Sequence, residues 1–316
     1  MEIKFIDLFA GIGGFRYGLE NIEKGGKPKQ VGNRRQSTNI KRNGENEQRA
    51  KSFECVYSNE WDKYANSVYR RHYEECDNRD IRTVKASEIS DFDLLCGGFP
   101  CQSFSIAGKR RGFDDTRGTL FFDIARILRE KRPRLCLLEN VKGLLSHDEG
   151  RTIKTIFATL TELGYDLQWQ VLNSKDFGVP QNRERIFIIG HLRGTPRPEV
   201  FPIAGNNEKA PFGPITGAIG RARSSGSSYV GEVRADKSDT QENGSKPYDT
   251  DISGGAAYTN AIRRLTPVEC ERLQGFPDNW TQYGADGELI SDTQRYKMCG
   301  NAVTTNVITE IAKRLV

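Results

Sequence analysis

Short apolar runs recur along the first two thirds of the chain, and stretches with helical spacing separate them. Each run spans five to seven residues, which is a usual length for a buried strand. The runs occupy residues 3–9, 53–58, 92–96, 134–140, 167–172 and 185–190. Because strands that alternate with helices are typical of a parallel, doubly wound sheet, we predict an α/β fold.

Three stretches carry apolar residues at the spacing of amphipathic helices, within residues 120–128, 153–163 and 303–315. Pro133 and Gly164 close the first two helices. We expect the apolar faces of these helices to pack on the sheet.

The pattern is interrupted between residues 193 and 262, where Gly, Ser, Pro and Asn dominate and apolar clusters are few. Such a composition indicates either a small irregular domain or a long system of loops. Apolar spacing returns after this stretch. We therefore predict a main domain over 1–192, a second region over 193–262, and a segment over 263–316 that rejoins the main domain.

The net charge of +5 is local. Residues 22–52 hold nine Lys or Arg and three Glu, so this segment carries +6 and the remainder of the chain carries −1. The segment is polar and rich in Gly and Asn, which predicts a flexible insertion. Its basic residues leave two interpretations open: a solvated loop, or an arm that contacts nucleic-acid phosphates.

The composition excludes several classes of protein. No apolar run approaches the roughly 20 residues of a membrane-spanning helix, and the N-terminus has no basic and then apolar leader. We therefore expect a cytoplasmic protein without membrane contact. The seven cysteines are odd in number and form no Cys-x-x-Cys pair, which argues against a disulfide framework and a zinc site. We expect free thiols and no metal.

A glycine-rich turn at residues 11–14 follows the first predicted strand and would let the backbone approach a nucleotide-like ligand. The third glycine of a dinucleotide fingerprint is replaced by Arg16, which argues against a nicotinamide oxidoreductase. After the second strand, Glu60 could bind ribose hydroxyls and Trp61 could stack on a base. The alternative for this pair is a surface acid beside a packed indole.

The most informative stretch is Gly-Gly-Phe-Pro-Cys at residues 97–101. A cysteine at such a strand end is better suited to exposure in a cleft than to core packing, and its thiolate could attack a ligand. Glu139 ends another strand, and ligands bind at the carboxyl edge of open sheets. A buried carboxyl group beside a nucleophilic thiol indicates an acid that assists the substrate while the sulfur attacks.

These motifs, in this order, resemble those of the cytosine-5 DNA methyltransferases of bacterial restriction-modification systems. The resemblance covers residues 1–21, 53–190 and 263–316. It implies a Rossmann-like S-adenosyl-L-methionine-dependent methyltransferase domain with a small, irregular target-recognition domain over 193–262. It also implies a monomer that methylates carbon 5 of a flipped-out cytosine in double-stranded DNA, releases S-adenosyl-L-homocysteine, and acts beside a separately encoded restriction endonuclease.

The resemblance further implies roles for individual residues. Cys101 is implied as the nucleophile, Glu139 as the partner of cytosine N3, and Arg183 with Arg185 as organisers of the flipped base. The residues implied at the cofactor site are Phe9, Gly11, Gly13, Gly14, Glu60, Trp61, Asp80, Ile81, Pro100, Leu120, Asn301 and Val303. Residues 109–118 match the mobile loop that closes over DNA in the family. The insertion 22–52 departs from the family's compact members.

The chemistry of the reaction explains why a thiol and a carboxyl group are paired. Carbon 5 of cytosine is a poor nucleophile. Addition of a thiolate at carbon 6, with a proton or hydrogen bond given to N3, makes carbon 5 enamine-like. Carbon 5 can then accept a methyl group and lose its proton, after which the sulfur is expelled. No motif names the base that takes this proton.

Two other interpretations keep the fold and change the activity. RNA-directed members of the family share the cysteine and glutamate motifs, but they carry a Cys-Phe-Thr signature that this chain lacks. A catalytically silent DNA-binding module would not need Cys101, Glu139, Arg183 and Arg185 together. Labelled methyl transfer into DNA rather than tRNA separates these interpretations.

Deletion of residues 22–52 tests the role of the insertion. If the segment binds phosphates, its loss should make the slope of log affinity against log salt shallower by about 0.9 for each lost contact. We favour a solvated insertion, because the basic residues are interspersed with Gly, Asn and Gln. Affinity, salt slope and melting temperature should then hardly change, since surface insertions cost little loop-closure entropy. DNA titrations at several salt concentrations check this, and a slope shallower by about two or more would contradict it.

Overall fold

The computed structural model describes residues 2–22, 52–100, 120–203 and 264–315. Its helices and strands belong to the compact unit that residues 1–215 form with residues 265–316. Cys101, the predicted mobile loop and most of the insertion and of the second region lie outside the described residues. The domain boundaries given above therefore stay predictions.

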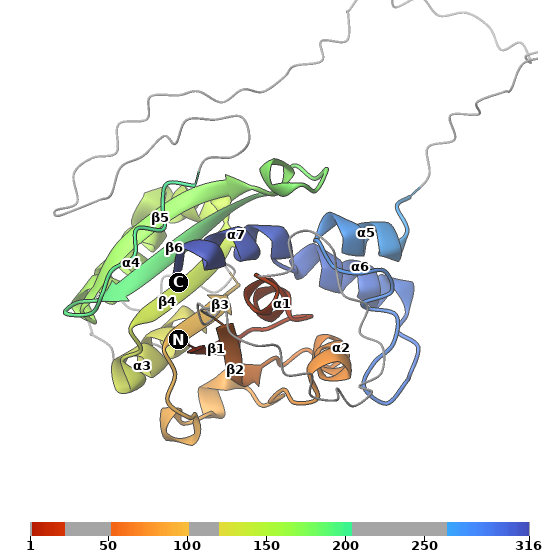
Figure 1. Ribbon diagram of the computed structural model, residues 1–316, viewed down its shortest axis with the longest axis horizontal. Helices are drawn as coiled ribbons and strands as arrows, with labels where there is room; N and C mark the ends of the chain where they lie inside the picture. Colours follow the sequence, from red (N-terminus) through yellow and green to blue (C-terminus); the bar gives the residue numbers. More distant parts are fainter. Residues whose placement is uncertain (1, 23–51, 101–119, 204–263, 316) are drawn as a thin grey trace, which may run out of the picture. The chain divides into compact units, whose positions relative to one another are not determined.

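Six strands of the described chain form one sheet, in the order β2-β1-β3-β4-β6-β5 (Figure 1). The strands are β1 (Glu2–Leu8), β2 (Ser52–Asn59), β3 (Leu94–Gly98), β4 (Leu135–Val141), β5 (Tyr165–Asn173) and β6 (Glu184–Leu192). Each predicted run coincides with one of these strands, so the six predicted strands are confirmed.

The prediction of a wholly parallel sheet is wrong for one strand. The pairs among β1, β2, β3 and β4 are parallel, but β6 runs antiparallel to both β4 and β5. Only residues 174–183 connect β5 to β6, and a parallel crossover needs a dozen or more residues. The short connection makes the chain return in the opposite direction. The amino end of β6 therefore meets the carboxyl end of β4.

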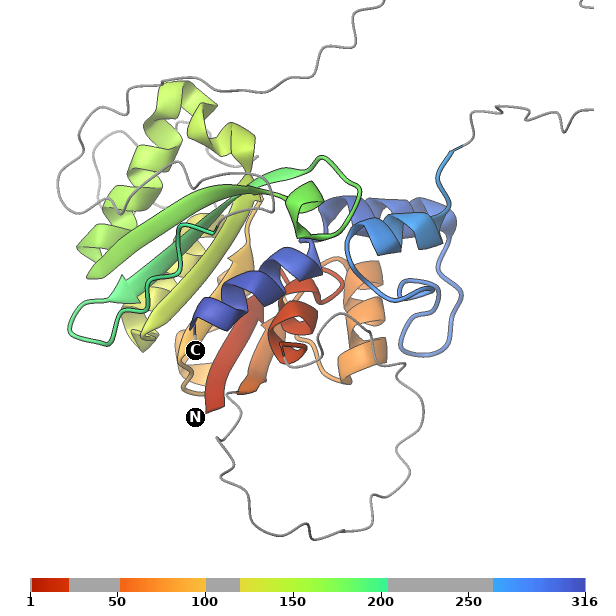
Figure 2. The same ribbon diagram turned by 45° about the horizontal axis from the view of Figure 1, so that its top comes forward.

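Helices cover both faces of the sheet (Figure 2). One face carries α3 (Leu120–Lys131) and α4 (Arg151–Glu162), and the other carries α1 (Gly14–Glu20) and α7 (Thr305–Leu315). The central strands are apolar on both faces: Leu138 packs with α3 and α4, whereas Leu137 packs with α1 and α7. The doubly wound α/β architecture is thus confirmed, with β6 as its antiparallel member.

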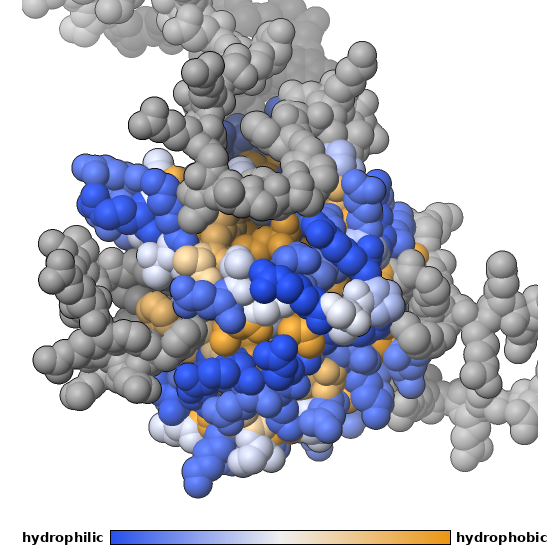
Figure 3. Space-filling view, turned by 90° about the vertical axis from the view of Figure 1, so that its left-hand side faces the viewer, coloured by the Kyte–Doolittle hydropathy of each residue, from blue (hydrophilic) through white to orange (hydrophobic). Residues whose placement is uncertain are grey.

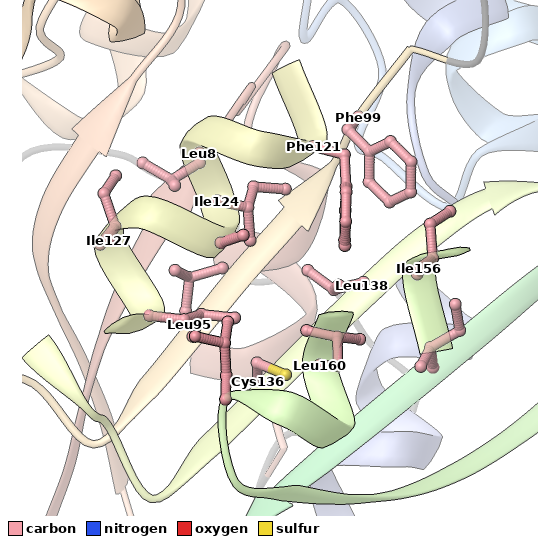
Figure 4. Close-up of a cluster of buried hydrophobic side chains, with 14 of the residues drawn as sticks. Leu8, Leu95, Phe99, Phe121, Ile124, Ile127, Cys136, Leu138, Ile156 and Leu160 are labelled. Atoms are coloured by element: carbon pink, nitrogen blue, oxygen red, sulfur yellow. The ribbon is translucent and has the colours of Figure 1, made fainter. Parts of the chain in front are cut away.

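A cluster beneath α3 extends to the end of β3 (Figure 4). Leu95 and Leu138 of the sheet pack there with Ile124 of α3. Phe99 follows β3 and lies with its ring centroid 5.5 Å from that of Phe121. The backbone that leads to residue 101 is therefore anchored in the core.

On the side of the molecule shown in Figure 3, hydrophilic residues predominate, with smaller apolar areas between them.

The C-terminal part packs against the glycine turn through a third cluster. The C-terminal part contains α5 (Pro267–Leu273) and α6 (Asp292–Asn301). In the cluster, Phe276, Trp280 and Met298 pack with residues of α2 (Lys63–Tyr73). Trp280 stacks on His72 at 3.5 Å between ring centroids, and its Nε1 donates to the Ile12 carbonyl at 2.9 Å. These contacts hold the glycine turn at residues 11–14 against the C-terminal part. No helix in the described part of the chain is long and apolar enough to span a membrane.

Two glycines allow α1 to approach the C-terminal segment closely. A Cβ on Gly18 would lie 2.5 Å from Ile308 Cβ and 2.8 Å from the Thr305 carbonyl oxygen. A Cβ on Gly14 would lie 2.6 Å from Val303 Cγ1. Real Cβ contacts are longer, so a side chain at either position would force the elements apart. These glycines serve helix packing.

Gly18→Ala should therefore lower the free energy of unfolding by about 1–3 kcal/mol, the usual cost of overpacking, in spite of alanine's better helix propensity. Gly300→Ala is the matched control, because a Cβ on this helical glycine would meet nothing within 4 Å. The control should be as stable as the wild type or slightly more so. Urea unfolding followed by circular dichroism checks both, and a Gly18→Ala variant as stable as Gly300→Ala would contradict the close packing.

Candidate functional site

Glu139 lies at the carboxyl end of β4, where it forms an ion pair with Arg185. The Arg185 Nε lies 3.0 Å from the Glu139 Oε1, and the two side chains are 20% and 13% exposed. Arg185 can reach this position because antiparallel β6 places it opposite Val141, two residues beyond Glu139. The antiparallel direction of β6 therefore brings Arg185 and Glu139 together.

Gly98 makes room for the second oxygen of Glu139. The two residues are paired across β3 and β4, and a Cβ on Gly98 would lie 3.1 Å from Glu139 Oε2. A larger residue at position 98 would crowd this oxygen. Glycine at position 98 therefore leaves room for Oε2 at the end of β3.

Burial raises the pKa of Glu139 above its ordinary value, although the charges of Arg185 and Arg183 oppose this rise. Burial, and then repulsion from Arg185, lowers the pKa of Arg183 to about 10. Arg183 therefore remains a cation at neutral pH. A carboxyl group whose pKa is raised can hold a proton nearer to neutral pH and can act as a proton donor.

Arg183 connects this site to the C-terminal segment. Its Nη2 donates to the carbonyl oxygens of Gly300 and Ala302 at 2.9 and 2.7 Å. Both acceptors lie at the end of α6, next to predicted cofactor residues Asn301 and Val303. The last part of the chain therefore helps to hold the arginine beside Glu139.

Asn140 holds the chain just before Cys101. Its side chain is buried, and its Nδ2 donates to the Phe99 carbonyl oxygen at 2.8 Å. Its Oδ1 accepts from the Val141 N–H at 2.8 Å. The sequence pointed to Glu139 at this strand end and gave no role to its neighbour. The available signal was that successive strand residues face opposite ways, so a buried Asn beside Glu139 needs a polar partner of its own.

Burial raises the pKa of five thiols among the described residues, which makes them poor nucleophiles. They are Cys55, Cys76, Cys96, Cys136 and Cys299. None of these five forms a disulfide bond within the described residues. Within the described ranges, no group of three or more His, Cys, Asp or Glu could hold a metal ion.

The glycine turn lies next to the ends of β1 and β2. Gly11 has a φ of 55°, and a Cβ on it would meet no described residue within 4 Å, which leaves room for a ligand to approach this backbone. Glu60 braces the turn: its carboxylate accepts from the Gly11 N–H at 2.8 Å and from the Asp62 N–H at 2.7 Å. Gly13 has a φ of 88° and lies against Tyr73. Burial raises the pKa of Glu60.

Trp61 is 64% exposed, so it is not the packed indole of the alternative interpretation. The guanidinium of Arg82 lies 6.0 Å from its ring centroid. Asp80 forms an ion pair with Arg82 and caps the short helix that begins at Ile81. Ile81 itself is buried in the cluster beneath α3.

The remaining predicted cofactor residues lie around these two groups. Phe9 and Leu120 are partly buried against the cluster beneath α3, while Val303 packs on Gly14. Pro100 and Asn301 are exposed. Among the residues that the structure describes, the predicted ones form two groups at one edge of the sheet. The glycine-turn group lies around Gly11, Glu60 and Trp61, and the acid group contains Glu139, Arg183 and Arg185. The end of α6 contacts both groups, through Arg183 and through Val303 at Gly14.

The chain matches the family model described as C-5 cytosine-specific DNA methylase over residues 3–211 and 207–316. It is 40% identical over 337 residues to the Type II methyltransferase M.HaeII of Haemophilus aegyptius, with 100% of this chain and 93% of the relative covered. It is 36% identical over 355 residues to the Type II methyltransferase M.HhaI of Haemophilus parahaemolyticus, with 98% and 93% covered. The solved structure of S. pombe Dnmt2 methyltransferase has a similar fold, with a TM-score of 0.60, 18% identity, and 99% and 98% of the chains covered.

Proposed function

Since the chain belongs to the C-5 cytosine-specific DNA methylase family, we propose that Cys101 and Glu139 act together on cytosine at the sheet edge that Arg185 completes. The protein is a site-specific DNA cytosine-5-methyltransferase of the kind found in restriction-modification systems. It takes its methyl group from S-adenosyl-L-methionine. The observation that carries the assignment of roles is the Glu139–Arg185 pair beside Gly98.

Chain connectivity supports Cys101 as the partner of Glu139. Cys101 is three residues beyond Gly98, so at most about 10 Å of extended chain separates it from the residue paired with Glu139. The hydrogen bond from Asn140 to Phe99 fixes the chain two residues before the thiol. The chain that leads to Cys101 therefore starts from a fixed point next to Glu139.

In the proposed mechanism, the Cys101 thiolate forms a bond to carbon 6 while Glu139 gives a proton or hydrogen bond to N3. Arg185 orients the carboxyl group of Glu139, and Arg183 adds positive charge near the base. After carbon 5 has accepted the methyl group and lost its proton to a base, the bond between sulfur and carbon 6 breaks and its electron pair returns to Cys101. A proton that N3 received from Glu139 returns to Glu139, which restores both groups. This sequence needs Glu139 to hold a proton before the attack, which its raised pKa favours.

The residues of the glycine-turn group fit S-adenosyl-L-methionine. An exposed indole can stack on adenine, Glu60 can accept from ribose hydroxyls, and the open backbone at Gly11 admits a close ligand. When bound, this cofactor supplies an electrophilic methyl group. We propose that it is held by Phe9, Gly11, Gly13, Gly14, Glu60, Trp61, Asp80, Ile81, Pro100, Leu120, Asn301 and Val303.

The substrate is DNA. We propose that residues 193–262 form the target-recognition region, with base reading confined to residues 204–262, because Val200, Phe201 and Ile203 are buried with the sheet. We also propose that the enzyme acts as a cytoplasmic monomer without a metal, on double-stranded DNA, and that a separate gene encodes a cognate endonuclease.

Cys101→Ser should abolish turnover and leave cofactor binding nearly unchanged, because a hydroxyl group is a far weaker nucleophile than a thiolate at neutral pH. DNA that carries 5-fluorocytosine at the target should form a denaturation-resistant adduct with the wild type, since fluorine cannot leave as a proton does. Cys76→Ser is the matched control and should still form the adduct, because burial raises the pKa of the Cys76 thiol to about 12. Adduct formation by Cys101→Ala would refute the nucleophile.

Glu139→Gln keeps a hydrogen-bond donor and loses the transferable proton, so the single-turnover rate should fall by roughly two to four powers of ten. Glu184→Gln changes a nearby exposed acid on β6 that pairs with Lys142, and it should retain the wild-type rate. The rates are measured at saturating DNA and cofactor. A Glu139→Gln rate within about threefold of wild type would exclude the acid role.

A further inference from the structure

Residues 193–203 leave β6 and return over the face of the sheet opposite α4 (Figure 2). Val200, Phe201 and Ile203 are buried there, in the cluster that α1 and α7 share. The segment contains no strand or helix, although these three residues are buried. Buried backbone groups need hydrogen-bond partners, so something other than a strand ladder must hold it.

The partner groups come from two glutamines of β5. Gln168 and Gln170 are two residues apart and therefore face the same side of the sheet, and they are only 5% and 7% exposed. Gln168 Oε1 accepts from the N–H groups of Val200 and Phe201 at 3.0 and 3.1 Å. Its Nε2 donates to the Pro198 carbonyl oxygen at 3.1 Å.

Gln170 holds the last described residue of the segment at both of its backbone groups. Gln170 Oε1 accepts from the Ile203 N–H at 2.8 Å, and Gln170 Nε2 donates to the Ile203 carbonyl oxygen at 2.9 Å. The two side-chain amides thus replace a neighbouring strand. We call Gln168 and Gln170 the glutamine clamp.

The orientation of the Gln168 amide determines the hydrogen-bonding role of His191. The His191 Nε2 lies 3.1 Å from Gln168 Nε2. Because Gln168 Oε1 already accepts from two N–H groups, the amide nitrogen must donate to His191, whose Nε2 then accepts as a neutral imidazole. Burial lowers the pKa of His191 to about 4, so this arrangement persists at neutral pH.

The clamp is in register with the catalytic acid. Gln170 is paired with Phe187 of β6, and Phe187 is paired with Glu139 of β4. Gln170 therefore lies two strand spacings, about 10 Å, from Glu139 along one row of the sheet. Through this row, the backbone of Ile203 is held at a defined place relative to Glu139.

We propose that the glutamine clamp is a positioning device that sets where the target-recognition region leaves the catalytic sheet, and so determines discrimination between DNA sequences. The proposal rests on the proposed assignment of base reading to residues 204–262, which begin directly after Ile203. Base contacts discriminate through two-point hydrogen-bond geometry, which small displacements disrupt. A start point fixed relative to Glu139 keeps these contacts in register with the cytosine that reacts.

Gln168→Met and Gln170→Met test the clamp, since methionine nearly matches glutamine in shape and lacks the amide. Hydrogen exchange at the amides of Val200, Phe201 and Ile203 should become faster in these variants. The kcat/KM ratio between the recognised sequence, identified by bisulfite sequencing, and a sequence with one altered base pair should fall by about tenfold, as for one lost base contact. Melting temperature and cofactor affinity are measured in parallel.

Val171→Ala is the matched control, because Val171 lies between the two glutamines on β5 and packs against the cluster on the α4 face. It should lower the melting temperature while leaving the discrimination ratio and the exchange at the amides of Val200, Phe201 and Ile203 as in the wild type. If the methionine variants melt earlier and discriminate as well as the wild type, the clamp is merely structural and the proposal is overturned.

A separate variant distinguishes failure of the clamp from failure of the recognition assignment. Replacement of residues 204–262 by a Gly-Ser linker should remove the binding preference for the recognised sequence over the altered one. A linker variant that keeps this preference overturns the recognition assignment and the clamp with it. A linker variant that loses the preference, while both methionine variants keep it, overturns the clamp alone.

Discussion

The ion pair between Glu139 and Arg185 is the constraint on which the rest of the site depends. A buried carboxyl group with no cationic or hydrogen-bonding partner would be strongly destabilising, so Glu139 needs Arg185 within reach. Arg185 is within reach only because β6 runs antiparallel to β4, and β6 runs that way because its connection to β5 is short. The site also requires glycine at position 98, since a side chain there would crowd the second oxygen of the Glu139 carboxyl group.

The C-terminal part of the chain contacts both the surroundings of Glu139 and the glycine turn near the N-terminus. Arg183 reaches the carbonyl groups at the end of α6, and Trp280 of the same C-terminal part bonds to Ile12 in the glycine turn. The close approach of α1 to α7 at Gly18 adds a third attachment. These contacts join the glycine turn and Glu139 at one edge of the sheet, although the residues that make them come from distant parts of the sequence.

The sequence predicts those features that depend on local pattern and on motif. Apolar runs were sufficient for the six strands, and the motifs around Cys101 and Glu139 were sufficient for the proposed reacting pair. The direction of β6 was missed, because apolar periodicity is the same in parallel and antiparallel strands. Gln168 and Gln170 were missed for a different reason: their alternation with apolar residues is also the pattern of a solvent-facing strand side, yet tertiary contacts bury both. Gln168 and Gln170 bond to backbone groups of residues 198–203, and because every residue type has such groups, the sequence does not identify these partners.

In Glu139, burial outweighs the charges of the two neighbouring arginines and raises the pKa of the carboxyl group, which favours the proposed role as a proton donor. The most direct measurement is a ¹³C NMR titration of the Glu139 side-chain carboxyl group in the free protein, assigned by the signal that Glu139→Gln removes. We expect a midpoint above the ordinary value of 4.5, because burial is the largest influence on the pKa of this group. A midpoint at or below 4.5 would show that the arginines hold Glu139 as a carboxylate, and it would contradict the claim.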